Sequence, residues 1–441
     1  MPQVDDLAAN LAPLLGDFLP RQRWFANDAA PGKVTITSVE VQQRDPLLAW
    51  ILAEVVLADG EPATYQLVVA ARPVEGQPDF LRGKERVTLG EVDEHIYYDA
   101  LVDPTLAVEV LAKVAPDEHA EVARPLVVEQ SNSSVVYDER LIMKFFRRLH
   151  PEPNPDVEIN RVLGERGFPH VVPQRAELRR DGVDLAVVRD YMLGSSDAWQ
   201  LALTSLRDLL GSRLPPDEAG GDLAPEAASL GEVTALLHQE MADAFGTFPA
   251  QPDLWLDDMR AQLARSPAGM VDVERVEAAL VRLIDVADAG LAIRVHGDLH
   301  LGQFLRADSG WFVLDFEGEP ARPVAERVRP SSPLRDVAGM LRSFHYASQA
   351  ALVDRGRDLD PELSKLAEAW ETRTVEAFWR GYQRTDGAQP LLPADEADQQ
   401  SLLQAFELEK AVYEVAYEQA HRPSWADIPA TAIGRVLGRV A

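Results

Sequence analysis

Short runs of β-branched and aromatic residues, interrupted by glycine, proline and aspartate, mark the N-terminal part of this chain. Residues 7–19 instead have apolar positions at helical spacing, so we expect a helix there. The runs after it predict strands, and the breakers between them predict turns. The expected strands are 33–41, 47–57 and 65–71. Residues 1–90 therefore form a small α+β unit in this interpretation.

Strands are expected again over residues 91–192, where polar turns separate short apolar runs. The predicted strands are 126–129, 134–137, 141–146 and 185–189. A helix is expected to begin after Asn154-Pro155-Asp156 and to carry Glu158 and Arg161. This part of the chain is predicted to be a second β-rich unit.

Helical patterns dominate from residue 193 to the end. Leu230, Val233, Leu237 and Met241 share one face of a helix that starts near Pro225. Residues 213–225 are rich in Pro, Gly and Asp and predict a surface loop. A small β island, residues 293–295 and 304–315, interrupts the helices. Residues 193–441 are thus expected to be mostly helical.

Charge narrows the classes of function. Acidic residues number 72 against 43 basic ones, which gives a formal charge of −29 and argues against binding to nucleic acids or anionic membranes. The chain has no cysteine, so disulfides and thiolate chemistry are excluded. No apolar run approaches the ~20 residues of a membrane span, and no secretory signal is present, so we expect a cytoplasmic protein.

Two aspartates that follow apolar strands carry the candidate chemistry. Asp298 lies in Arg294-Val-His-Gly-Asp-Leu-His-Leu-Gly-Gln303, and Asp315 ends the strand Trp311-Phe-Val-Leu. Phosphoryl transfer needs a base for the acceptor hydroxyl, Mg²⁺ ligands and cations for the phosphates. Asp298 suits the base, while Gln303 and Asp315 suit Mg²⁺, with Glu317 a further candidate ligand.

Each piece also has an ordinary structural interpretation. A lone aspartate after a strand is most often a turn residue or a helix cap. Two of them 17 positions apart, with His296-Gly297 before the first and Gln303 after it, favour the functional interpretation. His296 is assigned to the substrate site, although it, like His300, could instead pack the catalytic loop. Glu317 could equally be a solvated turn acid.

The pattern His-Gly-Asp-x-His-x-Gly-Gln followed by Asp-Phe-Glu resembles the aminoglycoside-phosphotransferase-like superfamily, a relative of eukaryotic-type protein kinases. More narrowly, the chain resembles actinobacterial maltokinases over nearly its full length. The further matching stretches are Leu19–Phe25, Glu129–Val135, Asn154–Val162, Leu314–Pro320, Ser332–Gly339 and Glu409–Glu414. The resemblance implies an α+β, bilobal, protein-kinase-like fold with three parts: a cap subdomain (1–90), a nucleotide-binding N-lobe (91–192) and a helical C-lobe (193–441).

Nucleotide-site residues follow from the resemblance. Lys144 ends a strand and is suited to the α- and β-phosphates of ATP, and Glu158 would pair with it, with Asp156 a weaker candidate. No Gly-rich loop precedes Lys144. A polar loop takes its place and could cradle phosphate through hydroxyl and N–H groups; it comprises Gln130, Ser131, Asn132, Ser133 and Ser134. Asp190 and Met192 resemble the hinge that reads adenine.

The predicted acceptor site lies near the C-terminus. Positions i, i+3, i+4, i+7 and i+8 place one set of side chains on a single helical face; they are Lys410, Tyr413, Glu414, Tyr417 and Glu418. Spacing alone favours a solvated, salt-bridged helix, but the resemblance favours a sugar site of aromatic rings and charged groups. Trp425 could wall this pocket or pack the helix end.

The resemblance implies phosphorylation of maltose by Mg²⁺/ATP at the anomeric hydroxyl, giving maltose 1-phosphate for α-glucan synthesis, with trehalose synthase as a partner. Asn27-Asp28-Ala29-Ala30 departs from the usual cap pattern, and the segment after Trp425 departs from the usual apolar run. Another acceptor, such as glucosamine, glucose or an aminoglycoside, therefore stays open. A pseudokinase fits less well because the catalytic residues are intact. A protein kinase fits less well because no activation-segment signature is present.

Overall fold

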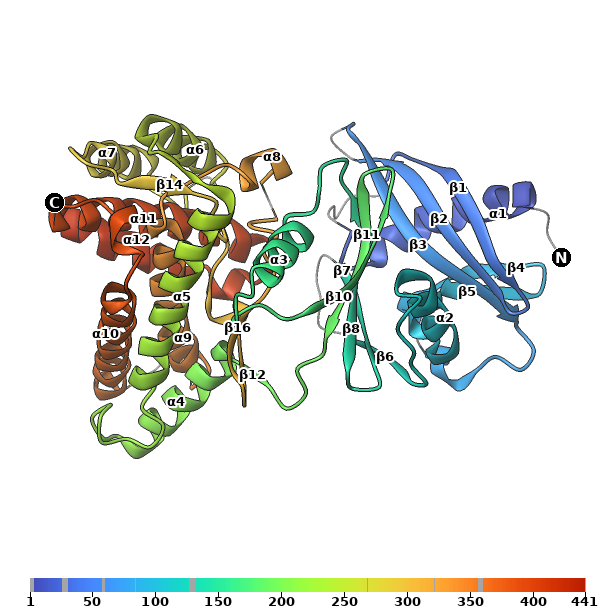
Figure 1. Ribbon diagram of the computed structural model, residues 1–441, viewed down its shortest axis with the longest axis horizontal. Helices are drawn as coiled ribbons and strands as arrows, with labels where there is room; N and C mark the ends of the chain where they lie inside the picture. The colour runs from blue at the N-terminus through green and yellow to red at the C-terminus, as the bar shows by residue number, and fades with distance from the viewer. Residues whose placement is uncertain are drawn as a thin grey trace. The chain divides into compact units, whose positions relative to one another are not determined.

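The structure is a computed structural model that describes residues 4–25, 31–57, 60–83, 85–126, 132–267, 269–320, 322–355 and 360–440. Contacts divide the chain into two compact units. The first comprises Met1–Arg161 with Val172–Leu193, and the second comprises Val162–Val171 with Gly194–Ala441. Sheets dominate the first unit and helices the second, which confirms the expected α+β class (Figure 1).

Two antiparallel sheets make up most of the first unit. One has the strand order β1-β2-β3-β5-β4, with β9 also paired to β3, and the other has the order β10-β11-β8-β7-β6. The elements are α1 (Val4–Phe18), β1 (Lys33–Arg44), β2 (Leu47–Val56), β3 (Pro62–Pro73), β4 (Thr88–Val92), β5 (His95–Asp99), α2 (Pro104–Val114), β6 (Ala123–Leu126), β7 (Asn132–Tyr137), β8 (Leu141–Phe146), β9 (Arg148–Leu149), α3 (Pro155–Glu165), β10 (Gln174–Arg180) and β11 (Val183–Asp190).

The middle strands of the first sheet, β2 and β3, are buried on both faces, which explains why most of their residues are apolar. In β2, Ala49 and Ile51 pack against α1, whose residues Leu7, Leu11 and Leu15 recur on one helical face. The alternate residues of the same strand face the opposite way. There, Leu48 and Trp50 pack into a core that contains α2 and side chains of the second sheet, among them Tyr137, Met143 and Phe145.

Polar side chains join the two sheets inside this core. Gln66 of β3 donates to the carbonyl oxygens of Phe146 and Leu185, at 2.5 and 2.6 Å, and accepts from Trp50 Nε1 at 3.0 Å. The fully buried Arg147 forms an ion pair with Asp99 of β5. Buried polar groups need such partners because water cannot reach them. These contacts therefore fix the position of one sheet against the other.

The second unit consists mainly of helices around two small sheets, with orders β12-β15-β16 and β13-β14. Its elements are β12 (Ser196–Asp197), α4 (Ala198–Ser212), α5 (Ala224–Phe245), β13 (Thr247–Pro249), α6 (Pro252–Ala264), α7 (Val273–Ile284), β14 (Leu291–Ile293), η5 (Leu301–Gln303), β15 (Phe304–Ala307), β16 (Gly310–Val313), α8 (Val324–Arg327), α9 (Leu334–Val353), α10 (Pro361–Arg384), α11 (Glu396–His421) and α12 (Asp427–Val440). Among the described residues, no helix combines the length and apolar character that crossing a bilayer requires.

Most expected elements are present, with two differences in the sheets. The strand expected at 126–129 is observed as β6, Ala123–Leu126, and residues 127–129 lie outside the described residues. The expected β island is two separate sheets, because β14 pairs with β13 whereas β15 pairs with β16 and β12. The division of the chain at residues 90 and 192 stays a prediction.

Helices α5 and α10 cross unusually closely through two glycines. A Cβ atom built at Gly231 would lie 2.0 Å from the carbonyl oxygen of Phe378, and one at Gly381 would lie 2.0 Å from that of Ala228. The two helix backbones therefore meet where neither glycine has a side chain, and any larger residue must push the helices apart.

Gly231→Ala is therefore expected to lower the free energy of unfolding by about 2–3 kcal/mol, the typical cost of overpacking. The control is Gly434→Ala in α12, where a built Cβ meets nothing within 4 Å and higher helix propensity should stabilise by about 0.5–1 kcal/mol. Denaturant unfolding of both variants measures the difference. Equal stabilities would contradict the close helix crossing.

Candidate active site

The loop that carries Asp298 follows β14 and is anchored by one buried carboxylate. Asp336, in the first turn of α9, accepts hydrogen bonds from the backbone N–H groups of His296 (2.8 Å) and Gly297 (2.9 Å). His238 Nε2 contacts the same carboxylate at 3.1 Å, and its Nδ1 contacts Tyr382 Oη at 2.8 Å. Burial would raise the pKa of Asp336, but these partners outweigh burial and lower it.

The same face of α9 holds the rest of the loop. Gly339, three residues after Asp336, lies against the loop so closely that a Cβ atom there would be 2.4 Å from the carbonyl oxygen of Leu299. Ser343, a further turn along, accepts a hydrogen bond from Leu301 N at 3.1 Å. Spacing of three and four residues puts these contacts in one row, so α9 sets the path of the loop.

His296 connects the loop to the turn that carries Asp315. Its Nε2 lies 2.8 Å from the carbonyl oxygen of Leu314, and its Nδ1 lies 3.3 Å from Asp298 N. A carbonyl only accepts and an N–H only donates, so one neutral tautomer of His296 satisfies both contacts. The ring is 2% exposed and packs on Phe316. Both nitrogens of His296 position the loop, and the expected substrate contact of His296 stays a prediction.

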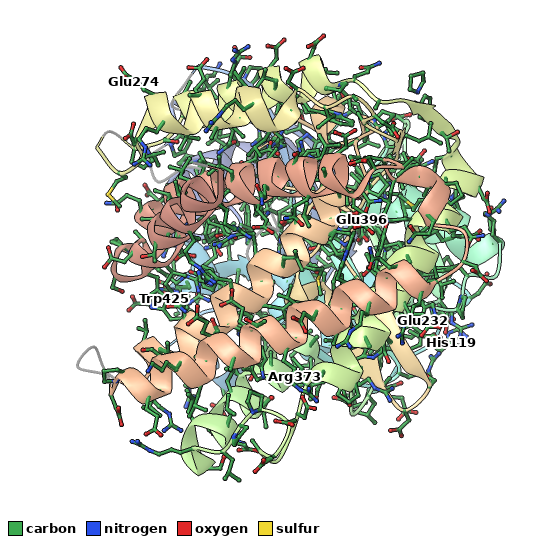
Figure 2. All side chains as sticks on the ribbon, turned by 90° about the vertical axis from the view of Figure 1, so that its left-hand side faces the viewer. His119, Glu232, Glu274, Arg373, Glu396 and Trp425 are labelled. Atoms are coloured by element: carbon green, nitrogen blue, oxygen red, sulfur yellow. The ribbon has the colours of Figure 1, made fainter. Side chains whose placement is uncertain are left out.

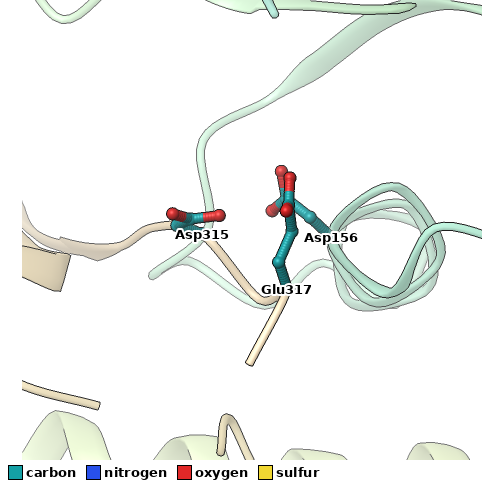
Figure 3. Close-up of side chains that lie close together, drawn as sticks. All are labelled: Asp156, Asp315 and Glu317. Atoms are coloured by element: carbon teal, nitrogen blue, oxygen red, sulfur yellow. The ribbon is translucent and has the colours of Figure 1, made fainter. Parts of the chain in front are cut away.

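Asp315 and Glu317 lie two residues apart on the turn after β16 (Figure 3). Asp315 has a φ of 59°, a left-handed conformation that Asp tolerates better than most residues. Leu314 N donates to the carbonyl oxygen of Gln303 at 2.9 Å, which ties this turn to the end of the catalytic loop. The side-chain nitrogen of Gln303 lies 3.3 Å from His300 Nε2, which orients its amide. Carboxylate and amide oxygens are the kind of ligand atoms that coordinate Mg²⁺.

Lys410 of α11 contacts Asp298 directly. Its Nζ donates to Asp298 Oδ1 at 2.7 Å and to Glu319 Oε1 at 2.8 Å, and it lies 4.7 Å from the centre of the Tyr413 ring. The structure thus brings together two of the predicted site residues, Asp298 and Lys410. Burial would lower the pKa of Lys410, but Asp298 and Glu319 outweigh burial and raise it well above its ordinary value.

Further charges continue this pair into a buried chain of alternating sign. Arg322 contacts Glu319 at 2.7 Å and Glu409 at 2.6 Å, and Arg335 contacts Glu409 at 3.2 Å. Burial would raise the pKa of Glu319, but the surrounding cations, led by Lys410 and Arg322, lower it to about 2. Three of these residues, Glu319, Arg335 and Glu409, line a pocket with Asp298 and Lys410.

The rest of the predicted acceptor face divides into two groups. Tyr413 and Tyr417 are stacked with ring centres 6.3 Å apart. Glu414 instead forms an ion pair with Arg342 of α9. Glu418 is 2% exposed, and both its oxygens accept from Arg422, at 2.7 and 2.9 Å. The carboxylate of Glu418 is therefore buried and paired, and its expected substrate contact stays a prediction.

Trp425 lies beyond the C-terminal end of α11, whose first residue is Glu396; both residues are labelled in Figure 2. Its ring centre is 5.9 Å from that of Tyr346, and the Arg422 guanidinium lies 4.9 Å from it. These contacts are those of a residue that packs the helix end, and a role as pocket wall stays a prediction.

Lys144 lies within the first unit, on β8. Its Nζ is 3.3 Å from the carboxylate of Asp156, which also accepts from Arg189 at 3.0 Å. Asp156, labelled in Figure 3, lies in the first turn of α3 and is fully buried. Asp156, the weaker candidate from the sequence, thus forms an ion pair with Lys144. The expected pairing of Glu158 with Lys144 stays a prediction.

The other nucleotide-site predictions are only partly covered. Gln130 and Ser131 lie outside the described residues, whereas Asn132, Ser133 and Ser134 begin β7. Ser133 Oγ accepts from Arg147 Nε at 2.8 Å. Asp190 accepts from Arg175 at 2.8 Å, and its N–H donates to Pro173. An adenine contact by Asp190 and Met192, and phosphate contacts by the polar loop, stay predictions.

Sequence reasoning missed the residues that hold the site together, chiefly Asp336, Glu319, Arg322 and Glu409. Asp336 lies within the stretch Ser332–Gly339, and Glu319 follows Asp-Phe-Glu by two positions. Because both segments lie among the stretches that match the family, the sequence did indicate that they are important to the protein. Their partners are distant in sequence, however, so spacing alone gave no indication of what they contact.

Asp336→Asn is expected to lower the free energy of unfolding by about 3 kcal/mol and kcat by about 100-fold, because an amide nitrogen would face backbone N–H donors that lose their acceptor. Asp354→Asn, at the exposed end of the same helix, should change stability by less than about 0.5 kcal/mol. Denaturant titration and steady-state rates measure both effects.

The pH dependence should follow the lowered pKa of Asp336. A depressed carboxyl pKa stabilises the fold above the unfolded-state value, near 4, and this contribution is lost as pH falls through the folded-state value. The wild type should therefore lose stability below about pH 4 more steeply than Asp336→Asn. Parallel stability curves would contradict this assignment.

Comparison with known proteins identifies two regions of the chain. Residues 18–103 match the maltokinase N-terminal cap domain, and residues 122–369 match the phosphotransferase enzyme family. The first region contains β1 to β5, and the second begins just before β6 and contains the loop of Asp298 and the turn of Asp315.

Two relatives and two solved structures extend these matches. A glucosamine kinase of Streptacidiphilus jiangxiensis is 31% identical over 331 residues, 71% of this chain and 73% of the relative. One of Mycolicibacterium smegmatis is 30% identical over 333 residues, 71% and 79% of the two chains. A glucosamine kinase in complex with glucosamine, ADP and inorganic phosphate has a TM-score of 0.65 at 24% identity, covering 98% of this chain and 100% of that one. A crystal form of a glucosamine kinase has a TM-score of 0.68 at 24% identity, covering 97% and 99%. The bilobal kinase-like fold is thereby confirmed, and the chain belongs to the phosphotransferase enzyme family, with an N-terminal region that matches the maltokinase cap domain.

Proposed function

We propose that this protein is an ATP-dependent sugar kinase in which Asp298 is the catalytic base. The acceptor hydroxyl oxygen attacks the γ-phosphorus of ATP, the bond from that phosphorus to ADP breaks, and Asp298 takes the hydroxyl proton. ADP and the sugar phosphate are the products. This role rests on the geometry of Asp298 and on the family of the chain.

The carboxylate of Asp298 supports the proposal because its two oxygens differ. Lys410 holds Oδ1 at 2.7 Å. In the part of the chain that the structure describes, no hydrogen bond reaches Oδ2, and the side chain keeps 20% of its surface exposed. A base needs one accessible oxygen within hydrogen-bond reach of the acceptor hydroxyl, and Oδ2 is the oxygen that we assign to this role.

Mg²⁺ and ATP complete the proposed chemistry. Gln303 and Asp315 are the proposed ligands of Mg²⁺, with Glu317 a further one, since all three offer hard oxygen donors. Bound Mg²⁺ would neutralise charge that develops on the phosphates. Lys144, oriented by Asp156 at 3.3 Å, is the proposed contact of the α- and β-phosphates.

Glucosamine is the acceptor that we propose first. The two relatives that match over more than two thirds of their length are both named glucosamine kinase. Two candidate residues for sugar contact remain beside Lys410 on α11: Tyr413 and Tyr417, whose stacked rings offer apolar faces of the kind on which sugar C–H groups pack.

Maltose is the second candidate, favoured by the match of residues 18–103 to the maltokinase cap domain. In that case the anomeric hydroxyl would be phosphorylated, and maltose 1-phosphate would enter α-glucan synthesis. Association with trehalose synthase and cytoplasmic residence stay predictions from the sequence.

Asp298→Asn tests the base. It should lower kcat by about 10³-fold while leaving ATP binding unchanged, because only proton transfer loses its acceptor. Asp308→Asn, on the exposed turn between β15 and β16, is the matched control and should keep full activity. Calorimetric ATP binding and coupled ADP release are the measurements. A variant with near-normal kcat would refute the role of Asp298.

An acceptor screen tests the substrate. Glucosamine, N-acetylglucosamine, maltose, glucose and kanamycin are each incubated with Mg²⁺ and ATP, and ³¹P NMR reads the position of the phosphate. We expect turnover of glucosamine and none of N-acetylglucosamine, which lacks the ammonium charge. Turnover of maltose alone would make the second candidate correct, and turnover of no acceptor would reject both.

A further inference from the structure

Lys410 has little hydrogen-bonding capacity left for a substrate. A lysine ammonium has three N–H donors. Two of them are committed to Asp298 and Glu319, at 2.7 and 2.8 Å, and the ammonium also lies over the Tyr413 ring. Its side chain is only 16% exposed. The resemblance implied a sugar contact for Lys410, which stays a prediction, and the observed contacts of its ammonium are with Asp298, Glu319 and Tyr413.

Glu319 is in turn fixed from the side away from Lys410. One of its oxygens accepts from Lys410, and the other accepts from Arg322 Nε at 2.7 Å. Arg322 also donates to Glu409 at 2.6 Å, and Glu409 lies one residue before Lys410 on α11. The contacts therefore form a closed circuit: Lys410, Glu319, Arg322, Glu409 and back along the helix.

This circuit resists rotation of the Lys410 ammonium. The side chains of Glu319, Arg322 and Glu409 are each no more than 10% exposed, so water screens their charges little and breaking one pair leaves a buried charge uncompensated. Lys410 and Asp298, which the circuit contacts through Lys410, are more exposed, at 16% and 20%. The buried part of the circuit is thus rigid, and Lys410 connects it to the carboxylate of Asp298.

We propose that Lys410 and Glu319 are positioning residues for the base: Glu319 fixes the Lys410 ammonium, which holds Oδ1 of Asp298 and so directs Oδ2 toward the acceptor hydroxyl. This inference rests on the proposed role of Asp298.

Kinetics of Lys410→Met, Lys410→Arg and Glu319→Gln test the positioning role, with the exposed Lys365→Met as control. Lys410→Met should lower kcat by about 100-fold and Glu319→Gln by about 10-fold, with KM for ATP unchanged, because only orientation of the base is lost. Full kcat in Lys410→Met would overturn the proposal. A parallel rise of KM for ATP in both variants would also overturn it, since that indicates general disruption of the fold.

Chemical rescue separates charge from packing. In Lys410→Ala, added n-propylammonium has the carbon and nitrogen atoms that the substitution removes, and it should restore kcat at least about 10-fold. Propanol, of similar shape without charge, should not. Equal rescue by both would show that Lys410 fills space and does not orient Asp298.

A measurement without turnover separates this inference from the proposed function. The chain has six lysines, so ¹⁵Nζ-lysine NMR gives few signals, and the missing peak in Lys410→Arg assigns Lys410. We expect its ammonium protons to exchange slowly, and to exchange fast in both Asp298→Asn and Glu319→Gln. Fast exchange in the wild type would overturn the proposal. Slow exchange in a protein that phosphorylates no sugar would reject the proposed function and leave the circuit intact.

Discussion

The hydrogen bonds from His296 and Gly297 to the buried carboxylate of Asp336 are the interaction on which the site depends. They attach the loop to the start of α9, and His296 then carries that attachment to the turn of Asp315 through Leu314. The proposed base, Asp298, and the candidate metal ligand Asp315 are therefore positioned by the same anchor. A backbone anchor of this kind leaves the side chain of Asp298 free to take part in chemistry.

Charge in this protein has two different characters. The formal charge of −29 belongs to the whole chain and keeps its surface acidic. Around Asp298 the balance is local and nearly even, because Lys410, Arg322 and Arg335 face Asp298, Glu319 and Glu409. Such pairing offsets the negative charge of these carboxylates locally, although the protein as a whole is acidic.

The sequence predicted the elements well because apolar spacing reports which side of a helix or strand is buried. It also predicted roles for Asp298 and Asp315, because their position after short strands can be recognised from neighbouring residues alone. It did not predict what the side chains of one face would contact. Lys410 and Glu418 share a face of α11, yet one contacts Asp298, more than a hundred positions away, and the other pairs with Arg422 four residues on. For the same reason, the sequence could not decide how the acids in the first turn of α3 contact Lys144; Asp156 lies 3.3 Å from its Nζ.

The two-sided burial of β2 and β3 has a consequence for the ancestry of the chain. Trp50 and Val68 on one face share a core with Tyr137 and Phe145, which lie in the region that matches the phosphotransferase family. A protein that gained or lost the cap region as a module would therefore expose half of this core to solvent. We expect the two regions to be inherited together, with substitutions on one side of the shared core compensated by substitutions on the other. The cap would then evolve as part of the kinase and not as an accessory to it.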